Sequence, residues 1–141
     1  MALEAFFQFK DKDDLYLVQD VDYEISQAFS NNYKPSGDPE GGLIRFTIIS
    51  PDPTDLTFHE WAISKKDVRS GKFSLPITKD IKQYWRYMYF KDAYCIGLRE
   101  CYSNSSGLQL YMNITICASY INWGQTEGGG VVFKNRGLIK D

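Results

Sequence analysis

The chain has 141 residues, of which 43% are hydrophobic and 24% are charged, and we expect one globular domain over residues 1–141. Its net charge of −2 argues against a dedicated nucleic-acid-binding protein, which would usually be basic. No apolar run is as long as a membrane-spanning helix requires, and the N-terminus lacks the basic start and apolar stretch of a signal peptide. We therefore expect neither membrane insertion nor a signal peptide.

Hydrophobic and polar residues alternate along most of the first half, which is the pattern of half-buried β-strands. The alternation predicts strands at residues 3–9, 15–18, 21–29 and 43–49. A turn-rich segment, residues 30–42, separates the last two. A short helix is predicted over residues 53–63, with Asp52 as its N-cap and Pro53 at the first helical position.

The second half continues the alternation. It predicts strands at residues 73–77, 84–90, 94–102 and 108–120, with Pro76 at a sheet edge and a bend near Asp92. The last of these strands is long and places Leu108, Ile114, Tyr120 and their even-numbered neighbours on the core face. The tail from about residue 124 has no clear assignment. The chain is thus predicted to be mainly β, a small antiparallel β-barrel or sandwich with one short α-helix.

Few residues are available for catalysis or metal binding. His59 is the only histidine, and the three cysteines, Cys95, Cys101 and Cys117, show no metal-binding spacing. We expect reduced thiols, with a Cys95–Cys101 disulfide as an open alternative. The expectation is a protein that is not an enzyme, with no catalytic residue, no metal site and no cofactor.

Two side-chain patterns favour a binding or assembly surface. Asp20, Asp22 and Glu24 form an acidic stripe on one strand face, which predicts a solvated or subunit-facing surface. Trp85, Tyr87 and Tyr89 share one face of a strand. This face would pack under the helix or against a second subunit, or would stack on a sugar or a single-stranded base.

Charge is also distributed unevenly along the chain. Residues 1–70 carry 7 basic and 13 acidic side chains, whereas residues 71–141 carry 9 basic and 5 acidic ones. If the two halves present opposite faces of the molecule, copies would associate head to tail; if the halves interleave in space, the charges would cancel.

The segment at residues 30–42 is unusually long for a connection between two strands. Its residues allow an extended loop of roughly 20 Å, long enough to reach another subunit. We expect Tyr33 to anchor it in a neighbour and Gly41-Gly42 to set its return angle, although a mobile loop with no partner is the alternative. The candidate interface residues are Tyr33, Pro35, Gly37, Pro39, Gly41 and Gly42.

Several motifs occur together in a recognisable order. They are Gly41-Gly42-Leu43-Ile44, the segment 58–63 with Trp61, the segment 90–95 with Asp92, Tyr94 and Cys95, and the strand 114–119. Over residues 3–121 the chain resembles the tube protein of type VI secretion systems, the Hcp or TssD family, in its Bacteroidetes form. The tail from Gly124 departs from that pattern.

The resemblance implies a β-barrel with one helix that assembles as a hexameric ring. Rings of this family stack with themselves into a tube inside a contractile sheath, with a spike protein at the tip and effector proteins in the lumen. Such a subunit would be made in the bacterial cytoplasm and secreted through the machine. The alternative that the residues leave open is a small ligand-binding β-barrel of the carbohydrate-binding type.

Overall fold

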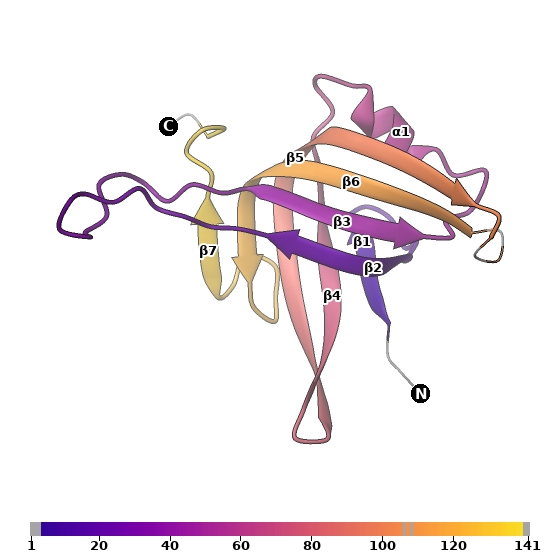
Figure 1. Ribbon diagram of the computed structural model, residues 1–141, viewed down its shortest axis with the longest axis horizontal. Coiled ribbons are helices and arrows are strands. Elements are labelled where there is room, and N and C mark those ends of the chain that lie inside the picture. Colours follow the sequence, from indigo (N-terminus) through magenta and orange to yellow (C-terminus); the bar gives the residue numbers. More distant parts are fainter. Residues whose placement is uncertain (1–3, 106, 108, 140–141) are drawn as a thin grey trace.

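The computed structural model describes residues 4–105, 107 and 109–139 of the chain. Over these residues the chain forms seven strands and one short helix (Figure 1). The elements in chain order are β1 (Ala5–Phe9), β2 (Tyr16–Tyr23), β3 (Leu43–Ile49), α1 (Thr57–Ala62), β4 (Arg69–Lys79), β5 (Lys82–Ser103), β6 (Gln109–Trp123) and β7 (Val131–Lys134).

Six of these strands close into a barrel. The antiparallel sheet has the order β3-β2-β1-β4-β5-β6-β7, and β3 also pairs with β6. One edge of β6 pairs with β5 over nearly its whole length, while its other edge pairs first with β3, from Tyr111 to Cys117, and then with β7, from Tyr120 to Trp123. The length of β6 therefore serves both closure and the addition of β7. The mainly β fold with one helix, expected from the sequence, is confirmed.

A corner in the long strands decides which residues face the core. The predicted strands at 84–90 and 94–102 are one strand, β5, and the predicted bend lies at Asp92, whose φ is 51°. On β5 the buried side chains are Met88 and Phe90 before the corner, and Ala93 and Cys95 after it. The inward face thus shifts by one residue at Asp92.

The same shift occurs opposite the corner on β6. Ile116 and Ala118 are buried, but the next core residue is Ile121, so the assignment of Tyr120 to the core face is wrong. The Ser119 hydroxyl donates to the Asp92 carbonyl at 2.9 Å, and the Asp92 amide donates to Ser70 Oγ at 3.1 Å. These bonds satisfy the backbone at the corner.

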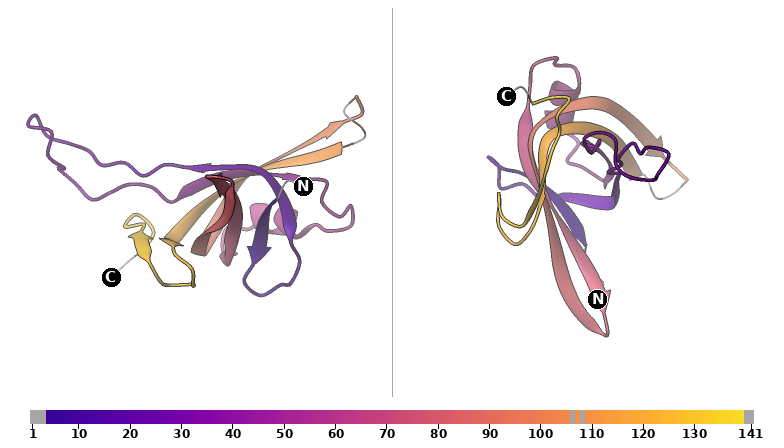
Figure 2. Two further views of the ribbon diagram at one scale, coloured as in Figure 1. Left: turned by 90° about the horizontal axis from the view of Figure 1, so that it is seen from below. Right: turned by 90° about the vertical axis from the view of Figure 1, so that its left-hand side faces the viewer.

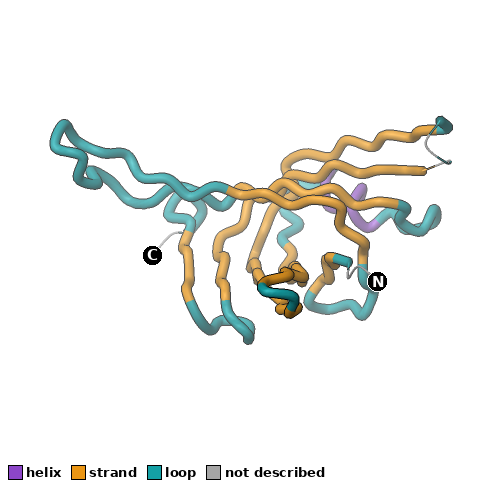
Figure 3. Tube along the Cα trace, turned by 60° about the horizontal axis from the view of Figure 1, so that its bottom comes forward, coloured by secondary structure: helices purple, strands orange, loops and turns teal. Residues whose placement is uncertain are grey.

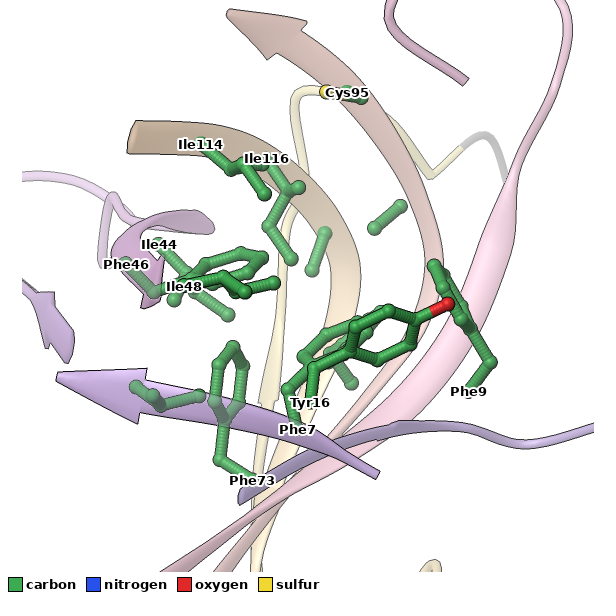
Figure 4. Packing of buried hydrophobic residues seen from close by; sticks show 14 of the residues in the cluster. Phe7, Phe9, Tyr16, Ile44, Phe46, Ile48, Phe73, Cys95, Ile114 and Ile116 are labelled. Atoms are coloured by element: carbon green, nitrogen blue, oxygen red, sulfur yellow. The ribbon is translucent and has the colours of Figure 1, made fainter. Parts of the chain in front are cut away.

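Aromatic rings and aliphatic side chains together fill the barrel (Figure 4). Phe7 lies at the centre, with its ring centroid 4.8–6.1 Å from the rings of Phe9, Tyr16, Phe46, Phe58, Phe73 and Phe90. Most of these contacts are edge-on or offset, the arrangements that aromatic quadrupoles prefer. Strands β1 to β5 and the helix all contribute a ring to this cluster, so it binds the elements together.

The helix is shorter than predicted, because residues 52–56 form turns instead. Asp52 Oδ1 accepts from the amide of Thr54 at 2.8 Å, and Asp55 Oδ1 accepts from the amide of Thr57 at 3.0 Å. Asp52 thus ends up five residues before α1 and does not cap it, since short Asp side chains also bond the backbone two residues on. α1 packs against β5, with Phe58 and Trp61 in the core.

Other strand boundaries differ locally from the predictions. The predicted strands at 15–18 and 21–29 are the single strand β2, which ends at Tyr23. β4 begins at Arg69, and its Pro76 lies beyond the last residue that β1 pairs, so the missing amide leaves no gap in that ladder. The unassigned tail contains β7. Leu3 and Leu108, placed on strand faces from the sequence, lie outside the described residues.

Trp61 fixes the helix to the barrel, so its truncation tests the packing. Its side chain is fully buried and its Nε1 donates to the carbonyls of Asp67 and Ala93, both at 3.1 Å. Trp61→Ala is expected to lower the free energy of unfolding by about 3–5 kcal/mol. Urea titration measures this, with Ile63→Ala, at an 86% exposed position, as a control that should change it little. Equal effects of the two variants would contradict the packing described.

Candidate assembly surfaces

A long arm projects from the barrel between β2 and β3. It comprises residues 24–42 and extends away from the rest of the sheet (Figures 1 and 2). All of its residues up to Glu40 are exposed. The arm is a ribbon and not an irregular loop: Ser26 and Glu40 exchange two backbone hydrogen bonds of 2.9 and 2.7 Å, and Ser36 donates to Ala28 at 2.9 Å. It therefore begins earlier than residue 30, where the sequence placed the loop, and includes residues predicted as strand.

Two aromatic rings lie near the end of this arm. The rings of Phe29 and Tyr33 are stacked, with centroids 5.7 Å apart and planes 17° apart. Phe29 is 66% exposed and Tyr33 is 83% exposed, and Tyr33 has a φ of 63°. Phe29 was overlooked at the sequence level because it belonged to a predicted strand. Pro35 pairs with Phe29 across the ribbon, and Pro39 lies farther along the returning half.

The arm rejoins the barrel at Gly42. This residue has a φ of 99°, and a Cβ there would come within 2.4 Å of Asn135 Nδ2 and 2.9 Å of the Ala118 carbonyl. Gly41 is also close-packed, with a Cβ position 3.0 Å from the Glu24 carbonyl, whereas Gly37 has open space around it. Of the three glycines, only Gly42 has a positive φ.

Asn135, which no sequence pattern singled out, holds this junction. Its backbone amide donates to Ser119 at 2.8 Å and its side chain donates to the Ala118 carbonyl at 3.2 Å. The segment after β7 thus packs under the base of the arm.

A substitution at this junction should matter more than one within the arm. Gly42→Ala is expected to lower the free energy of unfolding by about 1–3 kcal/mol, through its positive φ and the crowding by Asn135. Gly37→Ala is the matched control, because its Cβ meets nothing within 4 Å. Thermal unfolding followed by circular dichroism compares the two, and a Gly42→Ala protein as stable as Gly37→Ala would refute the role of the junction.

The acidic stripe lies where β2 leads into the arm. Asp20, Asp22 and Glu24 are all exposed. Asp22 is paired across the ladder with Arg45 of β3, which is also exposed. The stripe is therefore continuous with the base of the arm.

The residues of the family motifs support the barrel from within or at its corner. Trp61 anchors α1, and Asp92 forms the corner of β5. Tyr94 is half-buried and Cys95 is buried, and burial raises the pKa of the Cys95 thiol. These positions build the fold that carries the exposed surfaces.

The aromatic face predicted on β5 is present and half-buried. Trp85 and Tyr87 stack with centroids 6.5 Å apart, Tyr87 and Tyr89 follow at 6.4 Å, and Lys72 Nζ lies 5.6 Å from the centre of the Tyr87 ring. The side chains of this face thus cover one another.

The single histidine and the three cysteines are the side chains with potential reactivity. His59 Nε2 lies 2.7 Å from Glu100 Oε2, and Cys95, Cys101 and Cys117 are free thiols, so the alternative Cys95–Cys101 disulfide is not formed. Among residues 4–105, 107 and 109–139, no group of three or more His, Cys, Asp or Glu is arranged to hold a metal ion. No helix in this part of the chain is long and apolar enough to cross a membrane.

The profile of the family described as "Hemolysin coregulated protein Hcp (TssD)" matches residues 1–130. The chain belongs to this Hcp (TssD) family. The match runs past Gly124, where the sequence resemblance was expected to fade. No curated protein matches the chain significantly by sequence.

Solved structures of Hcp proteins share the fold. Hcp1 from Flavobacterium johnsoniae has a TM-score of 0.74 at 21% identity, with 94% of this chain and 100% of that chain covered. Hcp1 from Salmonella typhimurium has a TM-score of 0.67 at 10% identity, with 97% of each chain covered. Hcp3 from Pseudomonas aeruginosa, described as a secreted protein, has a TM-score of 0.65 at 11% identity, with 94% and 99% covered. These structures agree in fold, and the profile match over residues 1–130 confirms the predicted family.

Proposed function

We infer that the chain is a structural subunit of the inner tube of a type VI secretion system. The observation that carries this conclusion is the family match over residues 1–130, and the shared barrel of the Hcp structures agrees with it. Nothing in the comparisons favours the alternative of a carbohydrate-binding barrel. The family is structural, and we propose that this member performs no catalysis.

The finer features of this function are part of the proposal. Six copies form a ring, and rings stack into a tube that lies within a contractile sheath and carries a spike protein at its tip. Effector proteins occupy the lumen, and the subunit is made in the cytoplasm and secreted through the machine. The projecting arm supports such an assembly, because a two-stranded ribbon with no core of its own is marginally stable and is stabilised by contact with another molecule.

The arm is the surface that we assign to contact between subunits. Its backbone bonds shape it in advance, so less conformational entropy is lost when it docks. Tyr33, with Phe29 beside it, supplies a rigid aromatic anchor of the kind that dominates interfaces. Asp20, Asp22 and Glu24 at the arm base face the same neighbour and orient the contact electrostatically.

Purification followed by electron microscopy tests the function as a whole. The protein should migrate as a hexamer by size-exclusion chromatography with light scattering, and negative-stain images should show rings. A monomer that binds an oligosaccharide, with a shift in tryptophan fluorescence, would overturn the proposed function in favour of the alternative.

The anchor is tested by removing the aromatic side chains of both residues at the end of the arm, which leaves the barrel unchanged. Phe29→Ser with Tyr33→Asn should leave the circular dichroism spectrum unchanged, because both rings are exposed and Asn accepts a positive φ. Assembly and secretion should be lost. Tyr102→Ser, at a 63% exposed tyrosine outside the arm, is the control and should assemble normally. Normal tubes from the double variant would show that the arm has no role in assembly.

The uneven charge distribution predicts that stacking depends on salt. Exposed charges are screened beyond about 8–10 Å at physiological ionic strength, so attraction between rings should weaken as salt rises. Tubes should shorten between low and high salt in negative-stain images, while the rings, whose larger interface relies more on burial, persist. Tubes of equal length under both conditions would contradict a charged stacking contact.

A further inference from the structure

The hairpin of β4 and β5 extends beyond the barrel as a second projection. β1 pairs with β4 only as far as Ser74, and β6 pairs with β5 only from Met88 onwards. Residues 75–87 are therefore a two-stranded ribbon that the described sheet leaves unpaired on both sides. Figure 1 shows its tip at the bottom of the view, and Figure 3 shows it pointing forward.

The turn at this tip is built from unfavourable residues. Asp80 and Ile81 form a two-residue turn with φ angles of 52° and 60°. Such turns favour Asn-Gly, and a β-branched residue with positive φ is a clear outlier because its side chain crowds the backbone. Ile81 is also 98% exposed, so no packing within the chain offsets this strain.

The charges beside the turn add a second local cost. Lys79 and Lys82 are directly opposite each other across the ladder, and like charges in that position repel. Both are exposed, and neither forms an ion pair within the described residues. An exposed β-branched residue between two unpaired lysines makes an unfavourable turn. The same side chains would complement a hollow that is apolar inside and acidic at its rim, where the aliphatic group would fill the hollow as a plug.

A hollow of that chemistry lies at the start of β2 and the end of β3. It has a volume of about 400 Å³, and its apolar wall includes Leu15, Leu17 and Ile49. Leu15 is 57% exposed. The charged side chains in its lining are all carboxylates: Asp14, Asp52 and Asp55. Hydrogen bonds from Thr54 stabilise the Asp52 carboxylate and lower its pKa.

The other hollows on the described surface complement the tip less well, because each contains cationic side chains. Two of them mix carboxylates with cations: one has Asp11, Glu60 and Asp67 beside Lys10, Lys12 and Arg69, and the other has Glu24 and Glu40 beside Arg45. A third hollow, beside the β4–β5 hairpin and the end of β6, is lined by Lys79 itself and by Arg86. The hollow between β1 and β4 carries three lysines, Lys10, Lys12 and Lys72, against two carboxylates, Asp13 and Glu127, so its lining has a net positive charge. These last two hollows would repel two further lysines.

The tip and the acidic hollow belong to different sides of one molecule. In Figure 1 the tip lies at the bottom, whereas the start of β2 and the end of β3 lie on the right. The tip can therefore reach this hollow only in another copy. A contact between two different patches is a head-to-tail interface. It does not form a closed dimer, so it can be repeated from copy to copy as an assembly grows.

We propose that the β4–β5 tip of one subunit, with Ile81 as its plug and Lys79 and Lys82 as its charges, inserts into the hollow around Leu15, Asp14 and Asp52 of a subunit in the next ring. The contact is small and charged, which suits the weaker junction between rings better than the closure of a ring. This inference rests on the proposed tube function and identifies the partner surface for stacking.

The first test improves the turn while removing the plug. Asp80→Asn with Ile81→Gly creates the favoured Asn-Gly turn, so the variant should unfold at the same temperature as the parent or higher. Its rings should form, but its tubes should be at least tenfold shorter in negative-stain images. A residue with a merely structural role would not combine retained stability with lost stacking. Tubes of parental length would overturn the proposal.

The second test reverses the charges on each side separately. The tip variant is Lys79→Glu with Lys82→Glu, which keeps the like-charge repulsion within the turn unchanged. The hollow variant is Asp14→Lys with Asp52→Lys, and Asp14→Lys alone replaces it if loss of the Asp52–Thr54 bonds prevents folding. Neither variant should stack alone, but mixed rings of the two should stack alternately, because each tip then meets a hollow of opposite charge. Absence of recovery on mixing would argue against this pairing.

A disulfide trap covers the case in which rings meet only transiently. Ile81→Cys with Leu15→Cys should give an open ladder of linked chains after oxidation, while each single variant reports the background from Cys95, Cys101 and Cys117. No linkage above background, or linkage only within single rings, would refute contact between rings. Failure of the parent to form rings at all would instead count against the proposed function, so the two failures are distinguishable.

Discussion

The pairing of β3 with β6 is the constraint on which the rest of the structure depends. Without it the strands would form an open, strongly twisted sheet, and the rings around Phe7 would face solvent. With it the aromatic side chains of β1 to β5, β7 and the helix meet in one core. The barrel is stable through its own burial, so the chain can carry projections that contribute nothing to that core.

The positive φ angles at the corner of β5 and at the two ribbon tips have different physical meanings. At Asp92 a positive φ turns a long strand, and hydrogen bonds with Ser70 and Ser119 satisfy the backbone there. At Tyr33 and Ile81 the same conformation occurs on exposed ribbon tips, where the isolated chain provides no compensating burial. The strain at Asp92 is compensated within the fold. The strain at the exposed tips indicates surfaces where contact with another molecule would compensate the unfavourable backbone conformation.

The sequence patterns succeeded where one local rule acted alone. Alternation located most strands, and the surplus length of the segment after β2 indicated a projection. They failed where rules competed or distant residues met. Asp52 bonded a turn and did not cap the helix, and the inward face shifted at Asp92, which moved Ile121 into the core and Tyr120 out of it. No sequence pattern indicated Asn135 or Ile81. The role of Asn135 depends on its contact with Gly42, and that of Ile81 on its φ angle, and neither can be read from the order of residues.

The sequence by itself determined the class of the fold, the family and the absence of an obvious catalytic set, because strand alternation, local motifs and residue counts are properties of residue order. Only the tertiary structure decided which strands pair, where the barrel closes and which polar and aromatic groups remain outside it. The physical reason is that closure of β3 on β6 depends on residues far apart in the chain. The arm, the hairpin tip and the acidic hollow take their positions from that closure. A single stretch of sequence does not specify which of its side chains will remain exposed, because that depends on which distant strands pair with it.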